Sequence, residues 1–367
     1  MNRNRFIISG GGTGGHIFPA ISIANAIRDE KSDAEILFVG AENRMEMEKV
    51  PAAGYEIIGL PVAGFQRKLT FRNLGVIVKL FRSMIMARNI VRKFKPDVAI
   101  GVGGYASGPV LRIAANRNIP CVIQEQNSYA GVTNRLLAKK VSKICVAYDK
   151  MERYFPAEKI VFTGNPVRGD LQNLNSKIDE ARKYFGLPSG KKVLLIVGGS
   201  LGARTLNHGV LNYLDQLIQS NIEVIWQTGK YYYPEILEKL KGIDSANLHP
   251  MEFIPRMDLA FAVSDLVISR AGAGTISELC LVRKPVVLVP SPNVAEDHQT
   301  SNAMALVEKD AAILVPDSDA QDQIIPKALE LISNEEKLKI LSENIGKLAK
   351  PDAAKNIVAE IFKLINE

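Results

Sequence analysis

The sequence predicts an α/β protein with two Rossmann-like domains, each built on a parallel sheet that carries helices on both faces. Short apolar strands alternate with helix-length stretches along the chain, which favours parallel strands joined by helices. A unit of strand, glycine-rich loop and helix opens the chain and recurs in part from residue 192. With 367 residues and 47% hydrophobic content, the chain is long enough for two such domains.

The first half begins with an apolar strand, a run of glycines and a helix. Residues 6–9 form a short apolar run and residues 17–27 have the apolar spacing of a helix, so the glycines between them form the turn. Further strands are predicted at residues 35–39, 98–102, 121–123 and 143–146.

The second half repeats this order. Residues 192–197 are predicted as a strand, residues 198–203 as a glycine-rich loop and residues 205–217 as a helix. Further strands are predicted at residues 223–226, 266–268 and 285–289.

The boundary between the halves is expected at residues 164–168, where Gly-Asn-Pro interrupts both strand and helix patterns. The expected domains are therefore residues 1–164 and 165–350. The last helix, within residues 351–367, follows Lys350-Pro351, and we expect a kink there to return it to the first domain.

Composition narrows the class of protein. The three cysteines lie in apolar stretches without metal-ligand spacing, so disulfides and structural zinc are not expected and a reducing cytoplasm fits. No apolar run resembles a signal peptide or approaches the roughly 20 residues that cross a bilayer. A soluble or peripherally bound protein is expected.

A net charge of +7 is compatible with a nucleic-acid-binding protein, but the excess of basic residues is concentrated in one segment of the chain. Residues 64–95 contain no acidic side chain, and this segment alone exceeds the net charge. No nucleic-acid partner is therefore expected. The nine basic residues of segment 64–95 are Arg67, Lys68, Arg72, Lys79, Arg82, Arg88, Arg92, Lys93 and Lys95.

The first glycine loop, residues 10–15, joins a strand to a helix, where backbone N–H groups can converge on a diphosphate. Gly10, Gly12 and Gly15 also satisfy the dinucleotide pattern G-x-G-x-x-G, with Glu42 as a ribose ligand, which leaves a nicotinamide cofactor open. The loop lacks the Lys-Ser/Thr ending of a P-loop, which disfavours ATPase chemistry. His16 follows the loop directly, as a catalyst or as a capping residue.

Two more glycine turns follow in the second half, at residues 198–200 and 269–278. A single dinucleotide needs fewer turns, although any α/β fold requires some of them. Glu278 lies about one helical turn into the third segment. There it can bind both hydroxyls of a ribose, or it can simply interact favourably with the helix dipole.

No metal ligand set is predicted. Asp317-Ser-Asp319 has the D-x-D pattern of metal-dependent sugar transferases, but it stands before a helix and is better explained as an N-cap. The four histidines are scattered. We expect no metal held by the protein, and Mg²⁺ accompanying a diphosphate stays open.

Eight motifs together resemble one family, the MurG transferases, and they extend over nearly the whole chain in the family's order. They are residues 11–19 (GGTGGHIFP), 103–109 (GGYASGP), 125–127 (EQN), 164–168 (GNPVR), 198–200 (GGS), 252–254 (EFI), 270–278 (RAGAGTISE) and 297–299 (DHQ).

The resemblance implies the GT-B arrangement, in which two Rossmann-like domains face each other across a cleft and the second holds most of the sugar nucleotide. It implies an inverting hexosyltransferase that moves N-acetylglucosamine from UDP-N-acetylglucosamine (UDP-GlcNAc) to the 4-hydroxyl of undecaprenyl-diphosphate-linked muramoyl-pentapeptide (lipid I), giving lipid II for peptidoglycan. Such an enzyme serves cell-wall biogenesis, and through it cell shape and division.

The resemblance also implies the donor site, motif by motif. The backbone of Ile254 meets the uracil and Glu278 the ribose. Ser200, Thr275 and Arg168 meet the diphosphate region, with Ala273 and Gly274 beside Thr275. Asn127 and Gln299 contact the N-acetylglucosamine, and Thr13, Gly14 and Gly15 close on the donor from the other domain.

His16 is the first candidate for the catalytic base, because an imidazole has a suitable pKa and lies beside the loop, and Glu125 is the second. Helix N-termini and Arg168 can stabilise the leaving diphosphate. Backbone amides of the glycine loop after a strand are expected to cradle the acceptor's diphosphate. That loop contains Gly103, Gly104, Tyr105 and Ser107.

Residues 64–95 are expected to dock on an anionic membrane, because a wide apolar band is flanked by Arg and Lys. The plainer alternative is a core helix with a solvated basic edge. The resemblance places the enzyme peripherally at the cytoplasmic face of the bacterial inner membrane.

Three other functions stay open. A nicotinamide-dependent oxidoreductase would use the first glycine loop and leave the other two unexplained. A UDP-GlcNAc epimerase would share the architecture and the donor. A catalytically idle membrane scaffold is disfavoured by the joint presence of His16, Glu278 and Gln299.

Overall fold

The computed structural model describes residues 4–62, 72–167, 169–171 and 173–366, and for residues 72–74, 170, 295 and 366 it describes the course of the backbone alone. The chain divides into two compact units, residues 1–167 with 350–367 and residues 168–349. The boundary expected at 164/165 lies three residues before the observed one. Each unit is described by itself below.

The first unit alternates strands and helices along the chain. Its strands are β1 (Arg5–Ser9), β2 (Glu35–Ala41), β3 (Glu56–Leu60), β4 (Val98–Gly101), β5 (Cys121–Glu125), β6 (Lys143–Val146) and β7 (Ile160–Phe162). Its helices are α1 (Gly14–Glu30), α2 (Glu46–Ala52), α3 (Arg72–Phe94), α4 (Ser107–Ala115), α5 (Val132–Leu137) and α15 (Ala353–Asn366), with 3₁₀ turns η1 (Met151–Arg153) and η2 (Ala157–Lys159).

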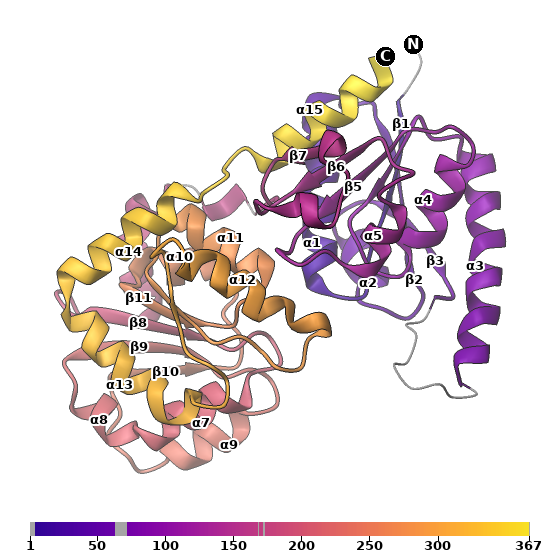
Figure 1. Ribbon diagram of the computed structural model, residues 1–367. Coiled ribbons are helices and arrows are strands. Elements are labelled where there is room, and N and C mark those ends of the chain that lie inside the picture. The colour runs from indigo at the N-terminus through magenta and orange to yellow at the C-terminus, as the bar shows by residue number, and fades with distance from the viewer. Residues whose placement is uncertain (1–3, 63–71, 168, 172, 367) are drawn as a thin grey trace. The chain divides into compact units, whose positions relative to one another are not determined.

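Within the described residues, the strands form one parallel sheet in the order β3-β2-β1-β4-β5-β6-β7. Successive side chains of β1 point to opposite faces, as the pleat requires. Ile7 packs with α3, α4 and α5, whereas Phe6 and Ile8 pack with α1 and α15. Figure 1 labels these helices around the strands of the first unit. A sheet buried on both faces explains why its central strands are continuous apolar runs.

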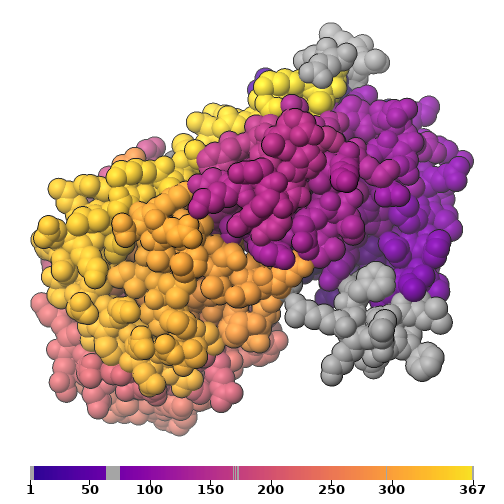
Figure 2. All heavy atoms as spheres, viewed as in Figure 1, coloured from indigo at the N-terminus to yellow at the C-terminus, as the bar shows by residue number. Residues whose placement is uncertain are grey.

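The C-terminal helix α15 packs on the first unit. Ile357, Val358 and Ile361 are buried against the same face of the sheet as α1, and the rings of Phe6 and Phe362 lie 5.7 Å apart. Figure 2 shows this helix in yellow against the magenta and indigo atoms of the first unit. At its start, the Lys350 ammonium lies 4.5 Å from the centre of the Phe162 ring.

The second unit repeats the plan. Its strands are β8 (Lys192–Val197), β9 (Ile222–Gln227), β10 (Leu248–Met251), β11 (Leu266–Ser269), β12 (Val286–Leu288) and β13 (Ile313–Leu314). Its α-helices are α6 (Ile178–Phe185), α7 (Arg204–Asn212), α8 (Leu214–Gln219), α9 (Tyr233–Leu240), α10 (Met257–Val263), α11 (Ala273–Val282), α12 (His298–Val307), α13 (Ala320–Ser333) and α14 (Glu335–Lys347). Its 3₁₀ turns are η3 (Gly169–Leu171), η4 (Leu174–Lys177) and η5 (Ala295–Asp297). In the described part of this unit, the sheet is again parallel, in the order β10-β9-β8-β11-β12-β13.

One predicted helix is broken. Residues 205–217 were expected as a single helix, but α7 and α8 are separated at Tyr213, whose φ is −117°. The Tyr213 N–H donates to the carbonyl of Val210, three residues back, and its hydroxyl donates to the carbonyl of Asp322. A tertiary contact with α13 therefore sets the break.

Candidate active site

The strand order reverses once in each unit, and this reversal locates the candidate site. β1 lies between β2 and β4, and β8 lies between β9 and β11. Loops that leave the carboxyl ends of such neighbouring strands part in opposite directions and open a ligand crevice. The glycine-rich segments 10–13 and 102–106 follow β1 and β4, and the segments 198–203 and 270–272 follow β8 and β11. In each unit, two glycine-rich segments therefore follow neighbouring strands, β1 and β4 in the first unit and β8 and β11 in the second.

In the first unit, the loops after β1 and β4 are in direct contact. A Cβ atom on Gly104, whose φ is +83°, would lie 2.3 Å from the carbonyl oxygen of Gly11. A Cβ atom on Gly103 would lie 2.8 Å from Nε2 of His16. Nδ1 of His16 lies 3.1 Å from the hydroxyl of Thr13. The predicted residues Thr13, His16, Gly103 and Gly104 therefore lie together.

The acceptor-loop residues differ in what they offer a ligand. Tyr105 is 58% exposed. Ser107 is buried, and its hydroxyl donates to the Gly104 carbonyl at 3.0 Å, which closes the turn into α4. Tyr105 therefore presents its side chain, whereas Ser107 shapes the loop.

Glu125 is enclosed by its own loop. Its carboxylate is 2% exposed and accepts hydrogen bonds from the N–H groups of Asn127 and Gly131 and from the side-chain amides of Asn127 and Asn134. Burial raises the pKa of this carboxyl group, although the four hydrogen bonds act in the opposite direction. The carboxylate holds the loop that carries Asn127.

Other buried amides join these loops and were not found from the sequence. The Gln126 side chain donates to the carbonyl of Val102 at 2.8 Å and to the side chain of Gln124. Gln124 donates to Asn165, which donates back to the carbonyl of Gln126. Gln126 forms part of a predicted motif, but nothing in the pattern distinguished its amide from that of a surface residue.

In the second unit, the loops after β8, β9 and β10 are joined by backbone hydrogen bonds. Lys230 N–H donates to the carbonyl of Ser200 at 3.2 Å, and Gly229 N–H donates to the carbonyl of Glu252 at 3.2 Å. Ser200 itself is exposed. Ile254 is 1% exposed, and its N–H donates to the side-chain oxygen of Gln227 at 2.9 Å. Gln227 occupies this N–H, so the carbonyl is the Ile254 backbone group to consider for a uracil.

Helix α11 begins at the carboxyl end of β11. Its N-cap is Gly272, which has no side chain to cap the first turn, and that turn holds Ala273, Gly274 and Thr275. The N–H groups of an uncapped first turn carry a partial positive charge that suits a diphosphate. Glu278 is half-buried farther along the same helix.

Gln299 lies in the first turn of α12, where its side-chain oxygen accepts a hydrogen bond from Ser291 N–H at 2.8 Å. The buried Asn302 of the same helix donates to the carbonyl of Ala271, just before α11. This bond connects α12, and with it Gln299, to the segment that leads into α11. Arg168 lies outside the described residues.

The D-x-D segment plays a role that the sequence did not reveal. Asp319 occupies the N-cap position of α13, but its side chain forms no capping hydrogen bond, so the expected N-cap interaction is wrong. Asp317 instead accepts hydrogen bonds from Arg270 and Thr205. Among the residues that the structure describes, no three His, Cys, Asp or Glu side chains lie close enough to hold a metal ion.

Helix α3 presents apolar side chains to the solvent. Val78, Phe81 and Ile85 are 62%, 68% and 63% exposed, whereas Ala87 and Val91 on the opposite side are buried. Lys79, Arg82 and Arg88 are exposed among them. Arg67 and Lys68 of the predicted basic segment lie outside the described residues. No helix in the described part of the chain has the length and hydropathy to span a bilayer.

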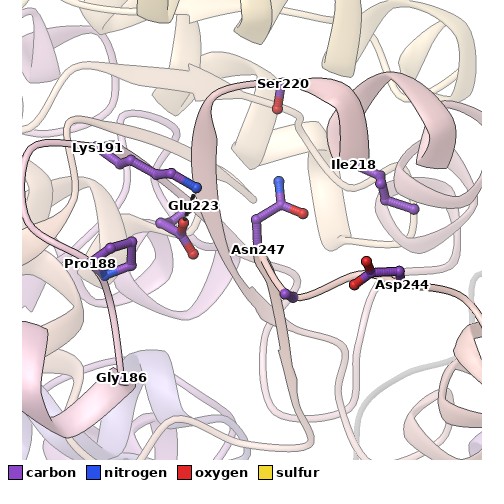
Figure 3. A pocket seen from close by; sticks show the side chains of 9 residues that line it. Gly186, Pro188, Lys191, Ile218, Ser220, Glu223, Asp244 and Asn247 are labelled. Atoms are coloured by element: carbon purple, nitrogen blue, oxygen red, sulfur yellow. Dashed lines mark hydrogen bonds and ion pairs between the residues drawn. The ribbon is translucent and has the colours of Figure 1, made fainter.

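A separate pocket of about 440 Å³ lies in the second unit, at the amino-terminal side of β8 and β9 (Figure 3). Lys191 and Glu223 in its wall form an ion pair at 2.8 Å, and Glu223 also bonds to His249. Since the predicted loops lie at the carboxyl ends of the same strands, this pocket is not part of the candidate active site.

Two family models match the chain: the glycosyltransferase family 28 N-terminal domain over residues 6–146 and the family 28 C-terminal domain over residues 193–357. The chain is 59% identical over 367 residues, 100% of both proteins, to the UDP-N-acetylglucosamine--N-acetylmuramyl-(pentapeptide) pyrophosphoryl-undecaprenol N-acetylglucosamine transferase of Parabacteroides distasonis. It is 60% identical to the protein of that name from Bacteroides thetaiotaomicron, with 98% of this chain and 97% of the relative covered.

Solved structures agree on the fold. MurG of Acinetobacter baumannii has a TM-score of 0.76 at 28% identity, covering 98% of this chain and 99% of that one. The UDP-GlcNAc 2-epimerase of Neisseria meningitidis has a TM-score of 0.69 at 15% identity, covering 99% and 100%. At that identity, the epimerase shows a shared fold only.

Proposed function

The chain belongs to glycosyltransferase family 28 and, within it, to the MurG transferases with the GT-B fold, and we propose that it transfers N-acetylglucosamine from UDP-GlcNAc to the 4-hydroxyl of the muramoyl unit of lipid I. The observation that carries this proposal is full-length identity near 59% to transferases of that name. The epimerase and oxidoreductase alternatives are not favoured, because the chain is 59% identical over its full length to transferases of that name and only 15% identical to the epimerase.

For the donor, the second unit supplies most contacts in this proposal. The uncapped first turn of α11, with Ala273, Gly274 and Thr275, binds the diphosphate together with Ser200 and Arg168. Glu278 binds the ribose. The carbonyl of Ile254 meets the uracil, since its N–H is bonded to Gln227.

The sugar is bound by side chains from both halves of the chain. Asn127 and Gln299 contact the N-acetylglucosamine, and Thr13, Gly14 and Gly15 close on the donor. The Gln299 oxygen is bonded to Ser291, which leaves its NH₂ group to donate to a sugar oxygen.

His16 is proposed as the general base that accepts the proton of the attacking hydroxyl. For Nε2 to take up this proton, Nδ1 must carry the ring hydrogen and donate it to Thr13 Oγ1, 3.1 Å away. Glu125, buried and bonded to four donors, fits the positioning of Asn127 better than proton transfer. The acceptor's diphosphate is assigned to the loop with Gly103, Gly104, Tyr105 and Ser107.

The leaving diphosphate is stabilised, in this proposal, by the α11 amino terminus and Arg168. We propose that the protein itself holds no metal ion and that any Mg²⁺ at the site is bound by the diphosphate.

The exposed apolar and basic side chains of α3 are proposed to dock on an anionic membrane. A lipid-linked acceptor keeps its chain in the bilayer, so an enzyme that uses it must work at the surface. The site of action is therefore proposed to be the cytoplasmic face of the bacterial inner membrane, with the protein bound peripherally.

The test is incubation of the purified protein with radiolabelled UDP-GlcNAc and a lipid I analogue. A labelled, lipid-soluble product supports the transferase. Label that stays in the aqueous phase as a UDP sugar of changed configuration would show an epimerase, and tight binding of NADH in place of UDP would show an oxidoreductase.

A further inference from the structure

A buried carboxylate accepts a hydrogen bond from the backbone of the first glycine loop. Glu46, the first residue of α2, is 0% exposed. Both of its oxygens lie 3.1 Å from the amide nitrogen of Gly12, and Oε1 also accepts a hydrogen bond from Ala41 N–H at 2.9 Å. Its hydrogen bonds join the loop after β1 to the end of β2.

The loop is shaped around this carboxylate. Gly11 has a φ of +153°, and a Cβ atom there would lie 1.9 Å from Oε1 of Glu46. A Cβ atom on Gly40, at the other side, would lie 2.7 Å from Cγ of Glu46. The Gly12 N–H thus faces the interior of the unit, where it neutralises part of a buried negative charge. This N–H is not available to a diphosphate.

The side chains that the loop carries are those assigned to proton transfer. Thr13 follows Gly12 directly, and its hydroxyl contacts Nδ1 of His16. The backbone of Gly11 contacts Gly104, and Gly103 packs against the His16 ring. We propose that Glu46 is a positioning residue for the transfer reaction, which holds residues 11–13 so that Thr13 and His16 keep their place. The proposal rests on the role of His16 given above.

Glutamine cannot replace Glu46 without loss. An amide offers one acceptor oxygen, and its NH₂ group would face the N–H of Gly12 at the place where a carboxylate oxygen now lies. Two donors would then oppose each other inside the unit. The loop is expected to shift while the side-chain volume stays the same.

The experiment compares Glu46→Gln with Glu48→Gln, a matched control on the same helix whose side chain is 78% exposed. For Glu46→Gln, a displaced base should lower kcat about 10- to 100-fold, while the Kd for UDP changes less than about twofold, because the UDP contacts belong to the second unit. Glu48→Gln should retain wild-type kcat. Thermal unfolding confirms that each variant is folded.

A double-mutant cycle separates positioning from a general structural role. In a His16→Ala background, Glu46→Gln should change kcat less than about threefold, because residues that act as one unit are not additive. An equal loss of kcat in both backgrounds, wild-type kcat in Glu46→Gln, or a UDP affinity that falls as far as kcat, would each overturn the proposal.

Two further outcomes are distinguishable. If His16→Ala has normal kcat, His16 is not the base and the proposal that Glu46 positions it is overturned. The proposed transferase function is tested separately, by the product that the wild-type protein forms. If Glu46→Gln does not fold, Gly40→Ala displaces the same carboxylate from β2, and it should lower kcat with the UDP affinity unchanged. Normal kcat in a folded Gly40→Ala variant would then overturn the proposal.

Discussion

Arg270 and Asp317 form an ion pair in the second unit, with 2.5 Å between Nη1 and Oδ1. The other Arg270 nitrogen, Nη2, donates to the Thr205 hydroxyl, which itself donates to Asp317. Nη1 also reaches the carbonyls of Val289 and Pro290. Arg270 therefore fixes the ends of β11 and β12 and the start of the segment that leads into α11.

Removing the Asp317 carboxylate should destabilise the second unit and disturb the α11 turn. Both partners are largely buried, so Asp317→Ala is expected to lower the free energy of unfolding by about 2–3 kcal/mol, measured by urea unfolding, and to weaken UDP binding in calorimetry. Asp319→Ala is the matched control and should change neither. Equal loss of activity in both variants, with rescue by added Mg²⁺, would point instead to a metal-binding D-x-D.

Thr13 should matter through its hydroxyl. Thr13→Val keeps the shape of the side chain but removes the oxygen 3.1 Å from His16 Nδ1, so the imidazole loses this hydrogen-bond partner. We expect kcat to fall about tenfold or more, with an unchanged Kd for UDP. Thr13→Ser, which retains the hydroxyl, should keep most of the activity. Equal kcat in the two variants would show that the hydroxyl has no role.

Membrane binding should depend on the exposed face of α3. Phe81→Ser and Ile85→Ser remove apolar groups that are 68% and 63% exposed, so they should each weaken sedimentation with anionic vesicles about tenfold without loss of stability. Ile340→Ser, at a 47% exposed position on α14, is the control and should bind as the wild type. Binding should also weaken as salt rises, because each basic residue adds about 1 kcal/mol at low ionic strength.

The Lys191–Glu223–His249 cluster should make the stability of the second unit depend on pH. Burial tends to raise the pKa of Glu223, but hydrogen bonds from Lys191 and His249 outweigh it and hold this pKa below its ordinary value of 4.5. A lowered pKa gives stability that is complete above 4.5 and is lost as pH falls through the folded-state value.

Glu223→Gln should accordingly lower the free energy of unfolding by about 2 kcal/mol at pH 7. The difference from the wild type should shrink below pH 4.5, as unfolding curves across this range would show. Glu235→Gln, which breaks the surface pair with Lys239, should leave stability unchanged. A difference between wild type and Glu223→Gln that is constant with pH would mean that the pKa of Glu223 is the same in the folded and unfolded states.

The strands that the sequence revealed are those in the middle of each sheet. β1, β4, β5 and β8 are buried on both faces and therefore appear as uninterrupted apolar runs. The edge strands β3 and β10 were missed, since β3 alternates exposed and half-buried residues and β10 contains Pro250. An edge strand is fixed by pairing with a neighbour more than by its own hydrophobicity.

The sequence by itself determined the two Rossmann-like halves, the family and the residues of the glycine loops, because a buried parallel strand and a tight turn each restrict local residue types. Only the tertiary structure decided which groups meet. Glu46 lies under Gly12, Gln227 takes the N–H of Ile254 and Asp317 binds Arg270, and each contact joins segments whose separation follows from strand order. A hydrogen bond between distant segments leaves no periodic signal in the chain, so its partners become visible only when the sheet brings them together.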